Sequence, residues 1–165
     1  MVAVALFGVL ATLAVPAYRA MIQNNQIRNA AESIQTGIQL ARAEAVKSNA
    51  SVQFALVGTN SAWTVGCQTV TANCPAIIQN RVVGEGSSTN ITVTPAIVAD
   101  TGPYVFSSLG VLVSPSPTAA NGFIGLNVTN ASLTGLRNLR VIIGVGGSSR
   151  MCDPALANTD VRSCP

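Results

Sequence analysis

The chain has 165 residues, a length that suits a single domain with one hydrophobic core. Only 9% of the residues are charged and 48% are hydrophobic, whereas roughly a quarter is charged in ordinary soluble proteins, so part of this protein is not expected to face water. The net charge of +3 is too small to indicate nucleic-acid binding by itself. Histidine is absent, which removes the commonest general base and metal ligand and argues against an enzyme.

The first 20 residues, MVAVALFGVLATLAVPAYRA, carry no charge before Arg19 and are almost long enough to cross a hydrocarbon layer of ~30 Å. A secretory signal peptide opens with basic residues, and none precedes this run, so we interpret it as a retained anchor. The alternative is a buried helix of a soluble domain. We expect residues 1–20 to form a transmembrane or filament-core helix whose membrane and assembly contacts come from Met1, Val4, Leu6, Phe7, Leu10, Leu13, Val15 and Pro16.

Apolar residues recur at three- and four-residue steps between Met21 and Ser48, a pattern that predicts an amphipathic helix. We assign residues 21–50 to this second helical part. Pro16 removes a backbone donor, so the two parts need not be collinear. The apolar stripe consists of Ile27, Ala31, Ile34, Ile38, Ala41 and Ala45.

Short β-branched or aromatic runs, separated by Gly, Pro, Asn and Ser, follow the helix and predict antiparallel strands. The fold class is therefore α+β, with one long helix packed on an antiparallel β-sheet domain over residues 51–165. Leu112–Asn121, which is rich in Pro and Ser, and the tail Met151–Pro165 are expected to be loops. The expected strands are Ser51–Val57, Ala62–Val65, Ala76–Val83, Asn90–Thr94, Tyr104–Phe106, Gly122–Val128 and Leu139–Val145.

The four cysteines fall into two local pairs, Cys67 with Cys74 and Cys152 with Cys164. An even number in loop-like sequence indicates two disulfide bonds and an oxidising compartment. Three connectivities are possible, and we favour the two local bonds because they close short loops. Free thiols and a four-cysteine zinc site are the alternatives, although neither pair has the short spacing of a zinc knuckle.

No group of residues predicts catalysis or a cofactor. The carboxylates are scattered without a spacing typical of acid–base pairs. The glycine-rich segments Val82–Ser88 and Val145–Arg150 lack the lysine and the strand–loop–helix context of a phosphate-binding loop, and are expected to be turns. Ser148 and Ser149 have no histidine to activate them. We therefore predict a protein that is not an enzyme and that needs neither cofactor nor metal.

Pro16, Tyr18 and Arg19 end the apolar helix, and QNNQIRNAAESIQTGIQLARAEAVKSN follows. This arrangement resembles the type IV pilin superfamily, most closely its FimT/FimU and GspH branch, in which the amphipathic helix ends in a phrase like LARAEAVKSN. Family precursors carry a short basic leader, a cleavage glycine and a glutamate after the cut, so we expect the sequence to begin a few residues inside the mature chain. Further phrases similar to this branch are Ser61–Cys67, Phe106–Gly110 and Leu139–Cys152.

The resemblance implies the pilin fold and a structural role as a minor type IV pilin that primes or caps pilus assembly. The alternatives are a GspH-like pseudopilin of type II secretion, a DNA-binding FimT-like pilin for natural transformation, and a major pilin. The implied location is the inner membrane of a Gram-negative bacterium, as a single-pass protein with a periplasmic head, and then the pilus or pseudopilus. The implied partners are membrane lipid, other major and minor pilins, and the inner-membrane assembly platform.

DNA is a further partner that the resemblance suggests, because FimT-like pilins of transformable bacteria carry a GRxR motif whose arginines contact phosphates. The matching stretch here runs from Gly147 to Arg150, with Ser148 in place of the first arginine. Each lost phosphate contact weakens DNA binding. The alternative is that these arginines are solvated or contact another subunit. The candidate DNA-binding residues are Arg150, Arg137, Arg140 and Arg162.

Overall fold

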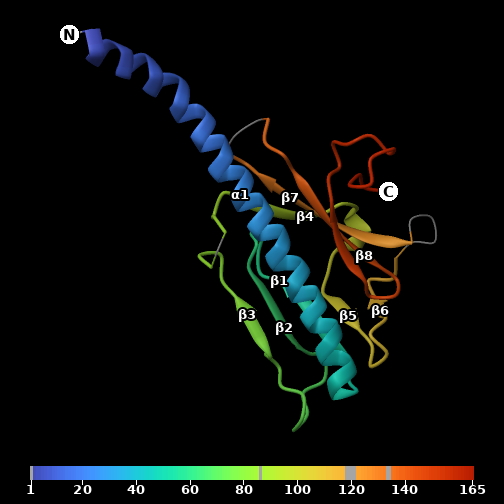
Figure 1. Ribbon diagram of the computed structural model, residues 1–165. Coiled ribbons are helices and arrows are strands. Elements are labelled where there is room, and N and C mark those ends of the chain that lie inside the picture. The colour runs from blue at the N-terminus through green and yellow to red at the C-terminus, as the bar shows by residue number, and fades with distance from the viewer. Residues whose placement is uncertain (1, 86, 118–121, 133–134) are drawn as a thin grey trace.

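One long helix, α1, runs without a break from Val2 to Ser48. The computed structural model describes residues 2–85, 87–117, 122–132 and 135–165, without the side chains of residues 2–14, 16 and 99. The backbone stays helical through position 16, so the two helical parts expected from the sequence belong to one helix. Asn49 ends it with a left-handed φ of 49°, and the Ala50 amide donates to the Ala45 carbonyl. The N-terminal half of α1 extends beyond the rest of the molecule (Figure 1).

A five-stranded antiparallel sheet has the strand order β3-β2-β1-β5-β6. Strands β1 and β2 pair along their whole length, from Val52 opposite Cys67 to Leu56 opposite Trp63. The bounds are β1 (Val52–Leu56), β2 (Trp63–Cys67), β3 (Gln79–Arg81), β5 (Tyr104–Phe106) and β6 (Leu112–Ser114).

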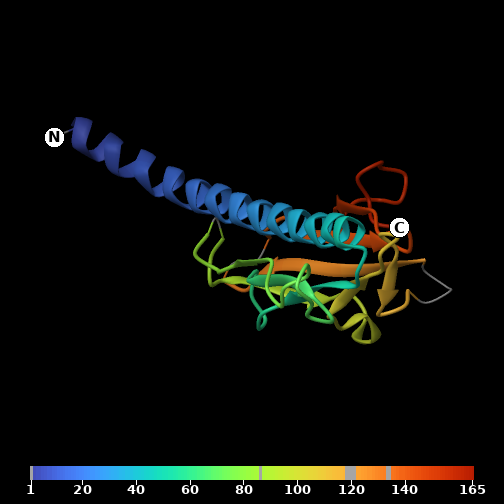
Figure 2. The same cartoon turned by 90° about the horizontal axis from the view of Figure 1, so that it is seen from below.

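A second, four-stranded antiparallel sheet has the order β4-β7-β8-β9. A short 3-10 helix, η1 (Val98–Asp100), connects β4 to β5. Helix α1 lies across one side of both sheets (Figure 2), so the sequence-based expectation of one helix on an antiparallel sheet holds, with two sheets in place of one. The bounds are β4 (Ile91–Pro95), β7 (Phe123–Asn130), β8 (Leu139–Gly144) and β9 (Ser149–Cys152).

Two strands lie where the sequence predicts turns or loops, and there the prediction was wrong. Strand β6 occupies the start of Leu112–Asn121, and β9 joins the end of the glycine-rich segment to the start of the tail. Each is stabilised by its neighbour, β5 for β6 and β8 for β9, and three or four residues are too few to show a period of their own. Residues 118–121 of the predicted loop lie outside the described residues.

The hydrophobic core lies between α1 and the two sheets. Phe54, Trp63 and Tyr104 from the five-stranded sheet are its largest side chains. The indole Nε1 of Trp63 donates a hydrogen bond of 2.9 Å to the hydroxyl of Ser33 on α1, which fixes where the helix sits on the sheet. All six residues of the apolar stripe predicted for the helix are fully buried here: Ile27, Ala31, Ile34, Ile38, Ala41 and Ala45.

The residues expected to contact membrane or filament partners fall largely outside the described side chains. Val15 is the exception, and its side chain is 47% exposed. In the part of the chain that the structure describes, no helix is both long enough and apolar enough to cross a membrane. Outside the described side chains lie those of Met1, Val4, Leu6, Phe7, Leu10, Leu13 and Pro16.

Candidate functional site

Two disulfide bonds fix the ends of strands β2 and β9. Cys67 bonds to Cys74 with 5.7 Å between their Cα atoms, and Cys152 bonds to Cys164 with 5.1 Å. These are the local pairs favoured from the sequence. The second bond returns the C-terminal tail to the end of β9, where the Asp153 amide donates to the Arg162 carbonyl at 2.8 Å.

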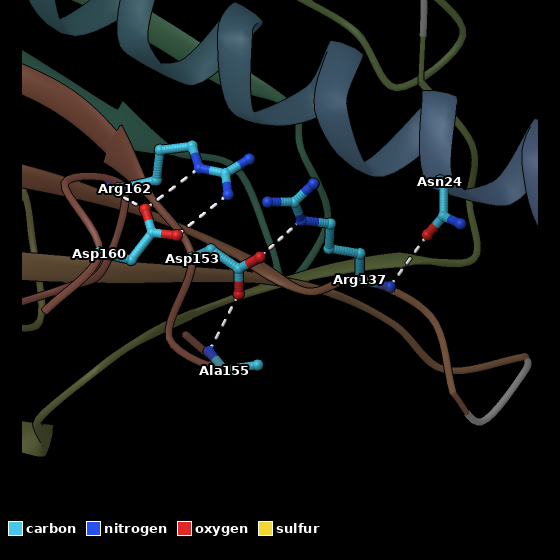
Figure 3. A network of polar contacts seen from close by, with 6 residues as sticks. All are labelled: Asn24, Arg137, Asp153, Ala155, Asp160 and Arg162. Carbon is cyan, nitrogen blue, oxygen red and sulfur yellow. Dashed lines mark hydrogen bonds and ion pairs between the residues drawn. The ribbon is translucent and has the colours of Figure 1, made fainter. Parts of the chain in front are cut away.

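An ion pair between Arg137 and Asp153 anchors the chain on both sides of the hairpin β8–β9. The Nε of Arg137 lies 2.5 Å from a carboxylate oxygen of Asp153, whose side chain is only 5% exposed. The other carboxylate oxygen accepts from the Ala155 amide at 2.9 Å, and the Arg137 amide donates to the Asn24 side chain of α1 at 2.9 Å (Figure 3). The pair thereby connects the helix, the segment before β8 and the tail.

A second ion pair joins Arg162 to Asp160 within the tail. Arg162 donates through Nε at 3.2 Å and through one terminal nitrogen at 3.0 Å, and its amide donates to the same carboxylate at 2.8 Å. The hydrogen bonds from Arg162 lower the pKa of Asp160 to about 2. The same pairing raises the pKa of Arg162. Both groups are therefore charged at neutral pH.

Asp153 makes folding stability depend on pH at the acid end. Burial raises its pKa, but the Ala155 amide and the Arg137 guanidinium outweigh burial and hold the pKa below the ordinary value of 3.8. A carboxyl with a lowered folded-state pKa contributes stability that is present above 3.8 and lost as the pH falls through the folded-state pKa.

We expect Asp153→Asn to lower the free energy of unfolding by about 1 to 2 kcal/mol at neutral pH, because the amide cannot replace the ion pair. The loss should shrink as the pH falls below 3.8, where the wild-type carboxyl also becomes protonated. Urea unfolding of both proteins across this pH range measures it. An Asp160→Asn control, at a more exposed ion pair, should change stability less, and equal losses in the two variants would contradict the role given to burial.

A cavity of about 370 Å³ opens between these ion pairs and α1. The helix contributes one wall, strands β8 and β9 the floor, and the tail the opposite rim. The lining residues are Asn24, Asn25, Arg28, Arg137, Leu139, Met151, Cys152, Asp153 and Arg162. We refer to this cavity as the arginine pocket.

The four arginines predicted as one DNA-binding patch are divided between two places. Arg137 and Arg162 line the arginine pocket. Arg140 and Arg150 belong to β8 and β9, where alternation places them on the sheet face opposite to the buried, helix-facing Val141. The Nε of Arg140 donates to the Asn127 side chain at 2.7 Å, whereas Arg150 is exposed on the edge strand.

Several residues of the arginine pocket are not among those predicted from the sequence. Asn24, Asn25 and Arg28 belong to α1, more than a hundred residues from the tail that they face. The available signal was the pair of asparagines just before the apolar stripe, because asparagine is a poor helix former in a helix interior. Leu139 and Met151 carry no signal of their own, since an apolar residue in a strand ordinarily belongs to the core.

A long N-terminal helix on antiparallel sheets is the fold of pilin-like subunits, and known structures share it. The minor pilin FimU of the Pseudomonas aeruginosa type IV system matches with a TM-score of 0.61 at 16% identity, over 82% of this chain and 95% of that chain. The minor pseudopilin EpsH of the Vibrio cholerae type 2 secretion system matches at 0.54 and 12%, over 79% and 99%. GspH of Escherichia coli matches at 0.51 and 14%, over 79% and 89%.

The sequence itself matches the family model of the type II transport protein GspH over residues 30–147. The matched region begins in the helix half that packs on the sheets and ends in the β8–β9 turn. A comparison with curated protein sequences gives no match. The chain therefore belongs to the GspH family, and the resemblance to the pilin superfamily found in its sequence is confirmed.

Proposed function

We propose that this protein is a non-enzymatic structural subunit, a minor type IV pilin that primes or caps the assembly of a pilus. The observation that carries the proposal is the exposed apolar surface of α1 beyond the sheets. The side chains of Tyr18 and Met21 are 66% and 62% exposed, and Val15 and Ile22 are exposed beside them in sequence. Apolar side chains gathered on one exposed helix mark an interaction surface.

The partner of this surface is a helix of a neighbouring pilin, with membrane lipid in its place before assembly. Helices in an apolar environment associate through close packing, so a subunit can exchange lipid contacts for contacts with other helices. The two disulfide bonds suit a head in an oxidising compartment such as the periplasm. We therefore place the anchor in the inner membrane of a Gram-negative bacterium, beside the other pilins and the assembly platform.

Photo-crosslinking in the source bacterium tests this role. A benzoylphenylalanine at position 18 should crosslink to other pilin subunits, because Tyr18 lies on the exposed part of α1. The matched control carries the same group at Ile77, which is 63% exposed but lies in the loop between β2 and β3. Equal crosslinking at both positions, or none at position 18 in a folded protein, would contradict the proposal.

Deletion of the gene distinguishes the two assembly systems. A minor pilin is required for surface pili, whereas a pseudopilin is required for secretion of proteins into the medium. We expect pili to be lost and then restored by the wild-type gene. Loss of secretion with normal pili would assign the protein to type II secretion, the alternative that the family match also fits.

DNA binding is less well supported by the arrangement of charges. Arg140 and Arg150 lie on one sheet face and Arg137 and Arg162 in the arginine pocket, so the four do not form one continuous row. Arg137 and Arg162 are also engaged with carboxylates. Salt-dependent binding of double-stranded DNA that Arg150→Ala weakens would restore this alternative.

A further inference from the structure

The arginine pocket combines an apolar floor with a cationic rim. Leu139 and Met151 form the floor together with Cys152, whose disulfide bond closes the tail. The rim carries the guanidinium groups of Arg28, Arg137 and Arg162, with the side-chain amides of Asn24 and Asn25 between helix and cavity. Such a mixture suits a ligand that has an anionic group attached to an apolar body.

Each rim arginine is oriented by a carboxylate that binds its Nε. Glu32 binds Arg28 at 2.8 Å, and the corresponding partners of Arg137 and Arg162 are Asp153 and Asp160. Within the described residues, the terminal nitrogens of Arg28 and Arg137 donate no hydrogen bond. The guanidinium groups of Arg137 and Arg162 both point toward α1 (Figure 3). One terminal nitrogen of Arg162 donates to Asp160, so among the residues that the structure describes Arg162 keeps only its other terminal nitrogen for a ligand, whereas Arg137 keeps both.

These carboxylates neutralise the net charge of the cluster, but they do not occupy the donors that matter for a ligand. The planar guanidinium has a second edge, formed by its two terminal nitrogens, that pairs with a carboxylate in a two-pronged geometry. Arg28 and Arg137 both keep this edge free within the described residues. The internal ion pairs thus reduce the side-chain freedom that binding would otherwise have to remove.

We propose that the arginine pocket binds a carboxylate-bearing, partly apolar segment of a neighbouring protein subunit. The carboxylate would lie between the free edges of Arg28 and Arg137, and an adjacent aliphatic side chain would cover Leu139 and Met151. A dry cavity of roughly 150 Å³ accommodates a benzene-sized group, so about 370 Å³ has room for both parts of such a segment.

The apolar floor favours a protein over a nucleic acid as the occupant. A phosphate backbone would pair with the arginines but leave Leu139 and Met151 uncovered. A phosphate backbone would also bind more strongly along a row of cations, but Arg140 and Arg150 lie on the other face of the sheet and do not extend the pocket's cations into such a row.

The proposal depends on the assembly role only for the identity of the partner, because the pocket can fail to bind a carboxylate while Tyr18 still crosslinks to pilins.

Methionine methyl signals in NMR spectra provide the test on the full chain. The protein has three methionines, of which Met151 lines the pocket and the exposed Met21 does not. The probe is N-acetyl-leucine, which carries a carboxylate on an aliphatic body. Its uncharged amide, inorganic phosphate and a double-stranded oligonucleotide are the comparison probes. We expect N-acetyl-leucine to shift the Met151 methyl signal in a saturable manner and to leave Met21 unchanged.

The variants Arg28→Gln and Arg162→Gln should each weaken binding of N-acetyl-leucine about threefold to tenfold, since each removes one charged group from the rim. Arg81→Gln, a charge removed from β3 outside the pocket, is the matched control and should have no effect. Equal shifts with the amide, no saturable shift with N-acetyl-leucine, or a Met151 shift produced by the oligonucleotide and not by N-acetyl-leucine would each overturn the proposal.

Discussion

The Trp63→Ala variant should lose about 4 kcal/mol of unfolding free energy, the largest effect expected for a single substitution in this protein. Trp63 is 1% exposed, and its ring centroid lies 5.7 Å from that of Phe54. Its indole also bonds to Ser33 of α1. The substitution removes a large buried side chain between helix and sheet and leaves a cavity that rigid neighbours cannot close.

Urea unfolding followed by circular dichroism measures this loss. The control Trp63→Phe keeps most of the buried ring but removes the donor to Ser33, so it should cost only about 1 to 2 kcal/mol. A phenylalanine variant as unstable as the alanine variant would show that the hydrogen bond, and not packing, determines the stability of the interface between α1 and β2.

Gly147→Ala should lower the free energy of unfolding by about 3 kcal/mol, the second-largest loss that we expect from a single substitution. Gly147 has a φ of 75°, a region that alanine rarely adopts. A Cβ atom at this position would lie 2.1 Å from the carbonyl oxygen of Gly110, which also accepts a hydrogen bond of 3.1 Å from Arg42. The turn between β8 and β9 therefore packs backbone to backbone against the turn between β5 and β6, with α1 beside both.

Gly146 is the matched control, one residue earlier in the same turn. A Cβ there would meet nothing within 4 Å, and Gly146 has no positive φ. Gly146→Ala should therefore change the free energy of unfolding by less than about 0.5 kcal/mol in the same urea experiment. Similar losses in the two variants would mean that neither the positive φ of Gly147 nor its contact with Gly110 explains the effect.

The role of Gly147 bears on the motif that the sequence suggested for DNA binding. The glycine at the start of the Gly147–Arg150 stretch is required by the close approach to Gly110, whatever the following residues bind. Arg150 lies on β9 and points away from the arginine pocket. The likeness of the Gly147–Arg150 stretch to the GRxR motif therefore reflects, at its glycine, a requirement of the fold and not of DNA binding.

The buried stripe of α1 could be predicted because its six residues repeat over five helical turns, long enough for the period to stand out. Strand β1 shows partial alternation, with Val52 and Phe54 buried. Strand β8 could be recognised by its β-branched run instead, since Val141, Ile142 and Ile143 are all buried. Strands β6 and β9 could not be predicted, since their hydrogen bonds depend on β5 and β8 and their own sequences are too short to alternate. The separation into two sheets also depends on pairings between distant segments.

The candidate site was only partly predictable. Arginines near the C-terminus are visible in the sequence, but their division between two faces follows from the register of β9 on β8. Asn24 and Arg28 reach the tail because α1 crosses the four-stranded sheet at that point. Residues 113 apart, such as Asn24 and Arg137, are brought together by the fold alone.

Because α1 has no break between its exposed and its docked half, the number of residues between them sets the direction in which the head faces. Each residue of an α-helix rotates everything after it by about 100° and advances it by about 1.5 Å. One residue inserted between Tyr18 and Ile27 would turn the sheets about 100° relative to the N-terminal half of α1. Seven inserted residues would restore that direction to within about 20° and move the head about 10 Å along the axis. The number of residues between Tyr18 and Ile27 thus sets both the rotation and the distance of the head relative to the N-terminal half of α1.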